Sequence, residues 1–353
     1  MELSSQRKVS HIDPSWSIDE VTSHLTNALT GQGDALAFSP VDYKTVNSRC
    51  AIIVTTTGTS GIKKDVALSA TALLTNARAS LSYLKAEPGE RWSLLLPINH
   101  VAGINVLIRS LELGTSPIDL RTSRDFVNVE YTAVVPTQLH SALSGDDELL
   151  DHLKSAKAVL VGGAALDLTL SRQAKENGIN VVTTYGATET SGGCIYNGTP
   201  LAGVEVTINN GVISIAGKTL AHGYLNHPEL WSDTSSFETQ DLGEIVDGKV
   251  KVLGRADDVI ISGGSNISLH QVEQLLRSNF PHSQAVALGL SDDHWGQALH
   301  VAHVGDLDTH VASQLLAENI GEAAKPKGFH RVNEIPLIGI GKIDRKALEK
   351  LLR

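Results

Sequence analysis

The chain has 353 residues, with 29 Lys and Arg against 39 Asp and Glu, which gives a formal charge of -10 at pH 7. This acidic balance, without a basic run or an aromatic platform, argues against a nucleic-acid partner. The length predicts about two domains with ample chain for a core. Cys50 and Cys194 have no metal-ligand spacing, and no secretory or membrane-spanning segment is evident. We therefore expect a reducing, cytoplasmic compartment and no membrane insertion.

In chain order, the first predicted element is a short amphipathic helix, because Ile18, Val21, Leu25 and Leu29 share one helical face. The rest of the first forty-odd residues is polar and is expected to be irregular. The following part then alternates between apolar runs and helical patterns. It predicts strands at 50–54, 92–96, 132–135, 158–161 and 180–183, and helices at 69–84, 147–156 and 167–177. Such alternation indicates an α/β layer with a largely parallel sheet.

From Gly203 onward the pattern changes to short β-rich segments. Asn210-Gly211 and Asp247-Gly248 predict tight hairpin turns, since these residue pairs tolerate positive φ. Beyond Gly254 a mixed pattern follows, with helices expected near 268–278, 309–318 and 344–352 and a strand at 285–290. These residues predict a second, smaller α+β domain.

One stretch directly after the strand at 50–54 combines hydroxyl side chains, two glycines and two lysines. It is Thr55-Thr56-Thr57-Gly58-Thr59-Ser60-Gly61-Ile62-Lys63-Lys64. Glycine lets the main chain approach a ligand closely, and lysine supplies a countercharge, so the stretch suits a polyphosphate. The spacing is not that of a Walker A motif, which disfavours a P-loop kinase or ATPase. A Ser/Thr/Gly-rich surface linker is the alternative.

Other stretches place polar groups at strand ends. His100 follows the strand at 92–96 and precedes a helix, which is the usual place for ligands in open α/β sheets, although a lone histidine is more often structural. The run from Tyr185 to Thr190 offers an aromatic face, a glycine, a hydroxyl and the Glu189 carboxylate. These are the groups needed to hold a nucleotide and its magnesium.

Three charged residues lie in glycine-flanked turns or before the last helix. For Asp241 and Arg255, the alternative to a functional role is an ordinary role in a hairpin turn. For Lys342, the alternative is a surface lysine without a function. Asp344, two residues later, is equally well explained as a plain helix N-cap.

Taken in order, these six stretches resemble the adenylate-forming superfamily of acyl-CoA synthetases, luciferases and peptide-synthetase adenylation domains, from about Ile52 to the C-terminus. The resemblance implies an α/β fold. A large N-terminal AMP-binding domain of layered sheets and helices would span residues 1–256, and a small mobile α+β domain would span 257–353 and turn about a hinge at Asp257. It also implies that a carboxylate attacks the α-phosphate of ATP, after which a thiol displaces AMP.

The resemblance further implies roles for individual residues. The implied catalytic residues are Lys342, which would bridge the carboxylate and the α-phosphate, together with Lys64, Thr188 and His100. The phosphates would lie against Thr56, Thr57, Gly58, Thr59, Ser60 and Gly61, and Glu189 would bind Mg²⁺. Adenine and ribose would contact Gly163, Ala164, Tyr185, Gly186, Asp241 and Arg255. The pantetheine arm of CoA would pass Gly263 and Gly264.

The sequence departs from the family pattern in three places. Lys63 stands where proline is usual, Asp65 where glycine is frequent, and only 54 residues precede the phosphate stretch. The effect of Lys63 is left open. The shortened N-terminal part resembles the actinobacterial type of o-succinylbenzoate-CoA ligase, an enzyme of menaquinone biosynthesis. The expected reactants are therefore ATP with Mg²⁺, CoA and an aromatic dicarboxylic acid.

We expect the acid pocket to be bounded by His100, Gly163, Gly186 and residues 191–194, where small residues leave room. Arg109 is a candidate for holding the second carboxylate, with a solvated helix charge as the alternative. Two other functions stay open: an adenylation enzyme that loads a carrier-protein thiol, and a catalytically silent ATP-binding protein. The sequence leaves the oligomeric state open.

Overall fold

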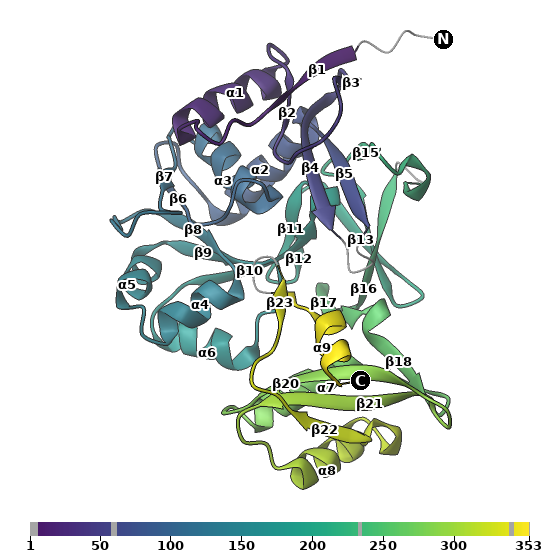
Figure 1. The fold of residues 1–353 in the computed structure, drawn as a ribbon. Coiled ribbons are helices and arrows are strands. Elements are labelled where there is room, and N and C mark those ends of the chain that lie inside the picture. Colours follow the sequence, from purple (N-terminus) through teal and green to yellow (C-terminus); the bar gives the residue numbers. More distant parts are fainter. Residues whose placement is uncertain (1–5, 58–61, 232–234, 339–341, 353) are drawn as a thin grey trace.

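The computed structural model describes residues 6–57, 62–231, 235–338 and 342–352, with only the backbone at 57, 257, 338 and 342. It is a mixed α/β molecule in which helices and several sheets form layers (Figure 1). The described residues contain no helix long and apolar enough to cross a membrane.

The N-terminal residues form more structure than the sequence indicated. A six-stranded sheet has the order β15-β5-β4-β2-β1-β3, built from β1 (Gln6–His11), β2 (Ala35–Ala37), β3 (Thr45–Asn47), β4 (Cys50–Thr57), β5 (Lys63–Ser69) and β15 (Gly223–Tyr224). The expectation of an irregular N-terminal stretch was wrong, because β1 is polar and half-exposed and gains its hydrogen bonds from β2 and β3. The predicted helix is confirmed as α1 (Ile18–Thr30), which a Ser17–Glu20 capping box starts.

A seven-stranded sheet follows, in the order β12-β11-β10-β9-β8-β6-β7. Its strands are β6 (Trp92–Leu94), β7 (Ile118–Asp119), β8 (Tyr131–Val134), β9 (Ala158–Val161), β10 (Val181–Ala187), β11 (Gly192–Tyr196) and β12 (Thr199–Pro200). Strands β7, β6, β8, β9 and β10 run parallel, as predicted, and β11 and β12 pair antiparallel. The sheet therefore has an edge at which the carboxyl ends of its parallel strands meet, where ligands bind in open α/β sheets.

Helices cover both faces of this sheet. On one face lie α2 (Ala70–Leu84) and α3 (Val101–Glu112), and on the other lie α4 (Pro136–Leu143), α5 (Asp147–Ser155) and α6 (Leu168–Glu176). Ser69 caps α2 as predicted, because its side chain accepts the N–H of Ala72.

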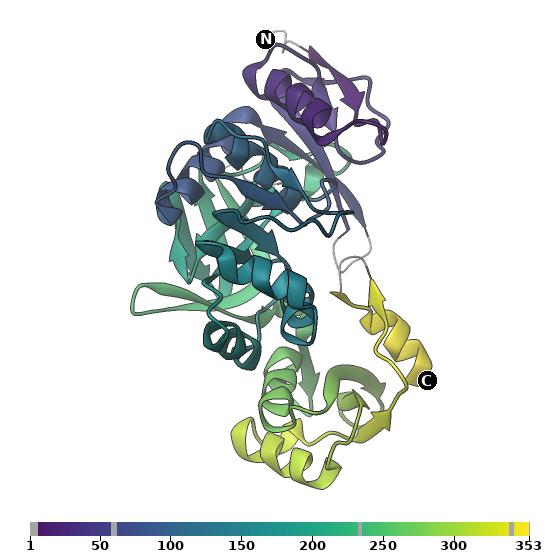
Figure 2. The same ribbon diagram turned by 90° about the vertical axis from the view of Figure 1, so that its left-hand side faces the viewer.

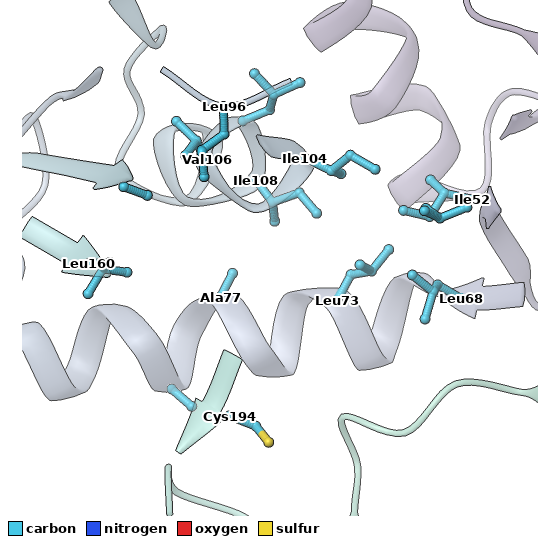
Figure 3. Packing of buried hydrophobic residues seen from close by; sticks show 14 of the residues in the cluster. Ile52, Leu68, Leu73, Ala77, Leu96, Ile104, Val106, Ile108, Leu160 and Cys194 are labelled. Atoms are coloured by element: carbon cyan, nitrogen blue, oxygen red, sulfur yellow. The ribbon is translucent and has the colours of Figure 1, made fainter. Parts of the chain in front are cut away.

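The main core lies around α2 and α3. Figure 3 shows Leu73 and Ala77 of α2 and Ile104 of α3 together with Ile52 of β4 and Leu160 of β9. The two helices are thus packed between the six-stranded and the seven-stranded sheet. Full burial of each Leu or Ile side chain contributes about 1.5–3 kcal/mol. This core fixes the relative positions of the β4–β5 hairpin and the carboxyl edge of the parallel sheet.

A four-stranded antiparallel sheet continues the chain, with β13 (Val204–Asn209), β14 (Val212–Gly217), β16 (Ser236–Val246) and β17 (Lys249–Arg255). Both predicted hairpin turns are confirmed. Asn210 and Gly211 have φ of 50° and 83°, and Asp247 and Gly248 have φ of 51° and 73°. Positive φ at both central residues is the geometry that matches the twist of the flanking strands.

The C-terminal part has a sheet and cores of its own. It contains β18 (Val259–Ser262), β19 (Ser265–Ser268), α7 (Leu269–Asn279), β20 (Gln284–Asp292), β21 (Gly296–Val304), α8 (Thr309–Asn319), β22 (Gly328–Arg331), β23 (Leu337–Ile338), β24 (Lys342–Ile343) and α9 (Arg345–Leu352). Four short 3₁₀ turns complete the described elements: η1 (Thr188–Thr190), η2 (Pro228–Leu230), η3 (Ala256–Asp258) and η4 (Glu322–Ala324).

The buried residues of this part pack among themselves on both faces of the β20–β21 sheet, around Val272 and Leu316 on one face and around Val286 and Leu348 on the other. Figures 1 and 2 show these green-to-yellow elements as a separate body beside the larger one. The division at Asp257 stays a prediction.

Candidate active site

The phosphate stretch joins the two strands of a hairpin, β4 and β5. Strands β4 and β5 are antiparallel, with Thr56 opposite Lys64 and Thr57 opposite Lys63. Gly58, Thr59, Ser60 and Gly61 lie outside the described residues, as does the side chain of Thr57. A Walker A loop connects a strand to a helix, whereas this stretch connects two strands, which agrees with the exclusion made from spacing.

Asp65 fixes the base of this hairpin. Its carboxylate accepts hydrogen bonds from the Thr55 hydroxyl at 2.7 Å and the Tyr43 hydroxyl at 2.9 Å. Its N–H donates to the side-chain oxygen of Asn226, whose amide in turn donates to the Lys63 carbonyl. Burial and then Asp65 raise the pKa of Tyr43 to about 12, so this hydroxyl stays a donor at neutral pH. The carboxylate that replaces the frequent glycine therefore has a structural task here.

Lys64 and Glu189 meet around one aromatic ring. The Lys64 ammonium lies 4.7 Å from the centroid of Tyr224, and the Tyr224 hydroxyl donates to Glu189 Oε1 at 2.7 Å. Glu189 is 8% exposed and Tyr224 5%. Burial and then Glu189 raise the pKa of Tyr224. The structure thus brings together two residues that are 125 positions apart and that were predicted to bind phosphate and magnesium.

Sequence reasoning missed Tyr224. It lies on the two-residue strand β15, which pairs with Val66 and Ala67 of β5. No local pattern marks this position, because its partners come from β5 and η1, which are distant in the chain.

The η1 turn presents Thr188 and Glu189 at the end of β10. The Thr190 hydroxyl accepts the Ala187 N–H at 2.9 Å, and Ser191, which follows, has a φ of 57°. The Glu189 carbonyl accepts the Ala221 N–H, which ties the turn to the segment before Tyr224. Glu189 is consequently fixed from both its side chain and its main chain.

This arrangement fits a magnesium ion. Mg²⁺ is commonly held by one or two carboxylates together with substrate phosphates and water. Glu189 supplies a buried carboxylate with one oxygen oriented by Tyr224, and the phosphate hairpin is adjacent through Lys64. The described residues contain no cluster of three or more His, Cys, Asp or Glu that could hold a metal ion by itself.

Tyr185, Asp241 and Arg255 form a second cluster. The Tyr185 hydroxyl donates to Asp241 Oδ2 at 2.6 Å, and Arg255 Nη1 lies 3.7 Å from Asp241 Oδ1. Arg255 also donates to Gln240, and strand pairing places it opposite Asp241. Burial and then Asp241 raise the pKa of Tyr185. Three of the residues predicted to hold adenine and ribose are therefore in direct contact with one another.

The glycine turn after β9 lies beside this cluster in the sheet. Gly163 has a φ of 82°, and a Cβ at Gly162 would come within 2.2 Å of the Thr184 hydroxyl. Since β9 and β10 are neighbours, Gly163 and Ala164 lie at the same sheet edge as Tyr185.

The expected acid pocket needs correction. A Cβ at Gly186 would come within 2.2 Å of the Gly192 carbonyl oxygen, so this glycine permits close backbone packing of β10 on β11 and leaves no room on that side. Ser191 and Cys194 are fully buried, and Figure 3 shows Cys194 within the hydrophobic core. Ser191 and Cys194 therefore belong to the packed interior and offer no open surface to an acid.

His100 stands at the predicted strand end, as the residue that precedes α3. Next to it, an open hollow of about 350 Å³ is lined by Leu95, Pro97, Ile98, Asn99 and Arg121. Gly103, one turn into α3, is needed because a Cβ would come within 2.3 Å of the Pro97 carbonyl oxygen.

Arg109, on the same helix, is not the solvated charge given as the alternative, since it is 3% exposed. It donates to the Tyr196 hydroxyl at 3.0 Å and lies 5.1 Å from the Trp92 ring centroid. Its Nε has no hydrogen-bond partner, and no carboxylate among the described residues forms an ion pair with it. One turn earlier, Asn105 donates to the Ser191 carbonyl, two residues after Glu189.

The remaining predicted residues belong to the C-terminal part. Lys342 lies on β24, with its side chain outside the described residues. Gly263 and Gly264 form the turn between β18 and β19 with φ of 56° and 82°. Asp344 is an N-cap, because its carboxylate accepts the Ala347 N–H. Figure 2 shows β23 and β24 extending toward the large body, on the side where β4 ends.

Comparison with known proteins gives a consistent result. The model of the family described as AMP-binding enzyme matches residues 4–225. The chain is 36% identical to the probable 2-succinylbenzoate–CoA ligase of Mycobacterium tuberculosis H37Rv, over 92% of this chain and 93% of that protein. It is 27% identical to the 2-succinylbenzoate–CoA ligase of Lactococcus lactis, over 99% of this chain and 82% of that protein.

Solved structures share the fold. The o-succinylbenzoate CoA synthetase (MenE) of Bacillus subtilis, in complex with the acyl-adenylate intermediate OSB-AMP, superposes with a TM-score of 0.77 at 24% identity, over 97% of this chain and 78% of that one. ATP-bound MatB from Rhodopseudomonas palustris gives a TM-score of 0.78 at 21% identity, over 96% and 82%.

Proposed function

The chain belongs to the AMP-binding enzyme family, and we propose that it is an ATP-dependent acid–CoA ligase that converts 2-succinylbenzoate to its mono-CoA thioester. The observation that carries this proposal is the contact of Lys64, Tyr224 and Glu189 beside the phosphate hairpin. The acid is assigned from the names of the relatives in M. tuberculosis and L. lactis.

In the first step, a carboxylate oxygen of the acid attacks the α-phosphorus of ATP and pyrophosphate leaves. This chemistry depends on positioning and on neutralising charge. Lys64 and the hairpin hold the outgoing phosphates, and Glu189 would hold a magnesium ion, which would supply charge neutralisation at the phosphates. Lys342 approaches from the small domain and stabilises the charge that develops between the carboxylate and the α-phosphate.

The nucleoside is held by the second cluster. Asp241 and Arg255 bind the ribose hydroxyls, and Tyr185 lies against adenine next to the turn of Gly163 and Ala164. The Tyr185–Asp241 hydrogen bond supports this assignment, because it orients the carboxylate before the nucleotide arrives.

In the second step the CoA thiol attacks the acyl carbonyl and AMP leaves. The small domain turns about Asp257, so that the β18–β19 turn with Gly263 and Gly264 replaces Lys342 at the site. His100 lies where the acyl group enters. We place the reaction in the cytoplasm, where both ATP and reduced CoA are available.

Arg109 holds the carboxylate of the acid that does not react. A buried cation without a counter-charge costs several kcal/mol, and so does a buried carboxylate without a cation. Binding of a dicarboxylate therefore resolves both costs at once. The orphaned Nε of Arg109 and the contacts that fix its guanidinium on Trp92 and Tyr196 support the assignment.

The test is pyrophosphate release across a panel of acids, with and without CoA. We expect 2-succinylbenzoate to exceed benzoate, a medium-chain fatty acid and an amino acid by more than about tenfold in kcat/KM. AMP and the thioester should appear only with CoA. A tenfold preference for benzoate or for the fatty acid would overturn the substrate and leave only the family.

A further inference from the structure

Lys342 lies on a weakly supported strand. Within the described residues, β24 pairs only with β23, through Ile343 opposite Leu337 and Lys342 opposite Ile338. A further backbone hydrogen bond joins the Asp344 N–H to the Pro336 carbonyl at 2.8 Å. Two-stranded ribbons are marginally stable by themselves. The position of the lysine must therefore be set by the helix that follows.

That helix, α9, is attached to the domain by Arg345, three residues after the lysine. Arg345 Nη1 donates to Glu273 Oε1 on α7 at 2.6 Å and to the Ala287 carbonyl on β20 at 2.9 Å. Arg345 Nε lies 3.4 Å from Asp258 Oδ1. One guanidinium thus joins the lysine segment to three other segments of the domain.

Both carboxylates belong to fixed parts of the structure. The Glu273 side chain is 6% exposed, and its Oε1 also accepts the Ala287 N–H at 2.9 Å. Burial acts to lower the pKa of Arg345, but Glu273 and then Asp258 raise it overall, so the guanidinium stays charged. Leu348, one turn later in α9, is fully buried against Val286 and Leu288. The polar and the apolar contact together fix α9 on the β20–β21 sheet.

Asp258 connects this attachment to the expected hinge. It ends η3 directly after Asp257, and η3 follows Arg255, which contacts Asp241 of the nucleotide site. Arg345 is therefore bonded to the first residue on the small-domain side of the expected pivot. A rotation at Asp257 then moves Asp258, Arg345 and the lysine strand as one unit.

We propose that Arg345 is a positioning residue for the acyl-adenylate step: its ion pairs with Glu273 and Asp258 hold the Lys342 strand rigid relative to the hinge. This inference rests on the proposed function, in which Lys342 serves the first half-reaction only. Arg345 contacts no reactant and acts through Lys342. Displacement of a catalytic group by about 1 Å can cost on the order of a hundredfold in rate.

The experiment compares Arg345→Gln, Arg345→Lys and Asp258→Asn with Arg331→Gln, a surface arginine of the same domain that pairs with the exposed Asp306. We measure acid-dependent pyrophosphate release without CoA, and thioester formation from pre-made acyl-adenylate with CoA. Arg345→Gln should slow the first by roughly thirtyfold to a hundredfold and leave the second within about twofold. Arg345→Lys and Asp258→Asn should show smaller losses of the same kind, and Arg331→Gln none.

A double-variant cycle separates positioning from fold stability. If Arg345 acts through Lys342, then Arg345→Gln costs nothing further in a Lys342→Ala background. Additive losses, or equal loss in both half-reactions, would overturn the proposal. Should Arg345→Gln not fold, Arg345→Lys and Asp258→Asn carry the same cycle.

Amide hydrogen exchange provides a readout that needs no substrate. Peptides that cover residues 342–352 should exchange faster in Arg345→Gln than in the wild type, and those from α7 should not. Unchanged exchange refutes the anchoring role even if the enzyme is active. If exchange is faster in Arg345→Gln but the wild type releases no pyrophosphate, the proposed function is refuted and the anchoring role of Arg345 stands.

Discussion

The nucleotide site and the Lys342 segment are built in opposite ways. Glu189, Tyr224 and Lys64 lie within the larger body, where a buried hydrogen bond fixes the carboxylate and a shared core fixes the sheets. Lys342 lies on a two-residue strand of another body, joined to its own core through Arg345 and Leu348. Under the proposed function, groups that bind throughout the reaction are preorganised, whereas the charge needed for one step is carried on the smaller body.

A similar contrast separates an ion pair between the two bodies from one within the small body. Within the described residues, Arg277 of α7 lies 3.9 Å from Asp167, the N-cap of α6. Exposed pairs of this kind contribute little, about 0–1 kcal/mol. Arg345–Glu273, inside the small body, is shorter and more buried. The small body should therefore move as a unit while keeping its own structure.

The largest expected effect comes from removing the charge of Lys342. Lys342→Ala should lower acyl-adenylate formation by about a hundredfold to a thousandfold, because one preorganised charge contact is lost. Thioester formation from pre-made acyl-adenylate should persist. Parallel assays of the two half-reactions check this, with Lys346→Ala on the exposed side of α9 as the control. Equal loss in both steps would remove Lys342 from its assigned role.

The buried cation of the large body should govern the choice of acid. Arg109→Met should lower kcat/KM for 2-succinylbenzoate roughly thirtyfold, since a hydrogen bond to a charged group contributes about 2 kcal/mol. Benzoate, which has no second carboxylate, should be affected much less. Arg78→Met, which removes the exposed pair with Glu112, is the control. An equal loss for both acids would make Arg109 a packing residue.

A smaller effect is expected when only the orientation of the magnesium carboxylate changes. Tyr224→Phe removes the hydroxyl that donates to Glu189 but keeps the ring beside Lys64. We expect the magnesium concentration for half-maximal activity to rise by roughly tenfold. Tyr43→Phe, which removes the hydrogen bond to Asp65 of the same hairpin, should leave this magnesium concentration unchanged. If activity depends on magnesium concentration in the same way in both variants, Tyr224 does not orient Glu189 for magnesium binding.

The smallest effect concerns acid stability. Burial lowers the pKa of His152, whose Nε2 bonds the Ser93 hydroxyl. Because the unfolded chain then binds the proton more readily, this histidine stabilises the fold above its unfolded pKa of about 6.5, and the stabilisation is lost as pH falls. The Tm of the large body should decrease between about pH 7 and pH 5, and less so in His152→Gln. The Tm of the exposed His310→Gln variant should follow that of the wild type. If the Tm of His152→Gln falls with pH as steeply as that of the wild type, His152 is not the origin of the acid sensitivity.

The sequence by itself determined the order of elements and the chemistry of the site. Apolar runs predicted the parallel strands from Trp92 to Thr183, and turn residues predicted both hairpins, because these signals depend on neighbours in the chain. The identities of Lys64, Glu189, Asp241 and Arg255 in their order indicated an adenylate-forming enzyme. These residue types indicate which groups a ligand needs, but they do not show which residues contact one another.

Only the tertiary structure decided the contacts. The polar strand β1 and the two-residue strand β15 are held by partners distant in sequence, so no local periodicity marks them. For the same reason Tyr224 and Arg345 escaped notice, since each acts through residues far along the chain. The glycines at 186 and 192 were predicted to leave space, but the backbone of the paired strand lies against Gly186, and the Asn105 side chain of α3 lies against Gly192. Whether a small residue forms a cavity or a close contact depends on what packs against it, and the fold alone supplies that neighbour.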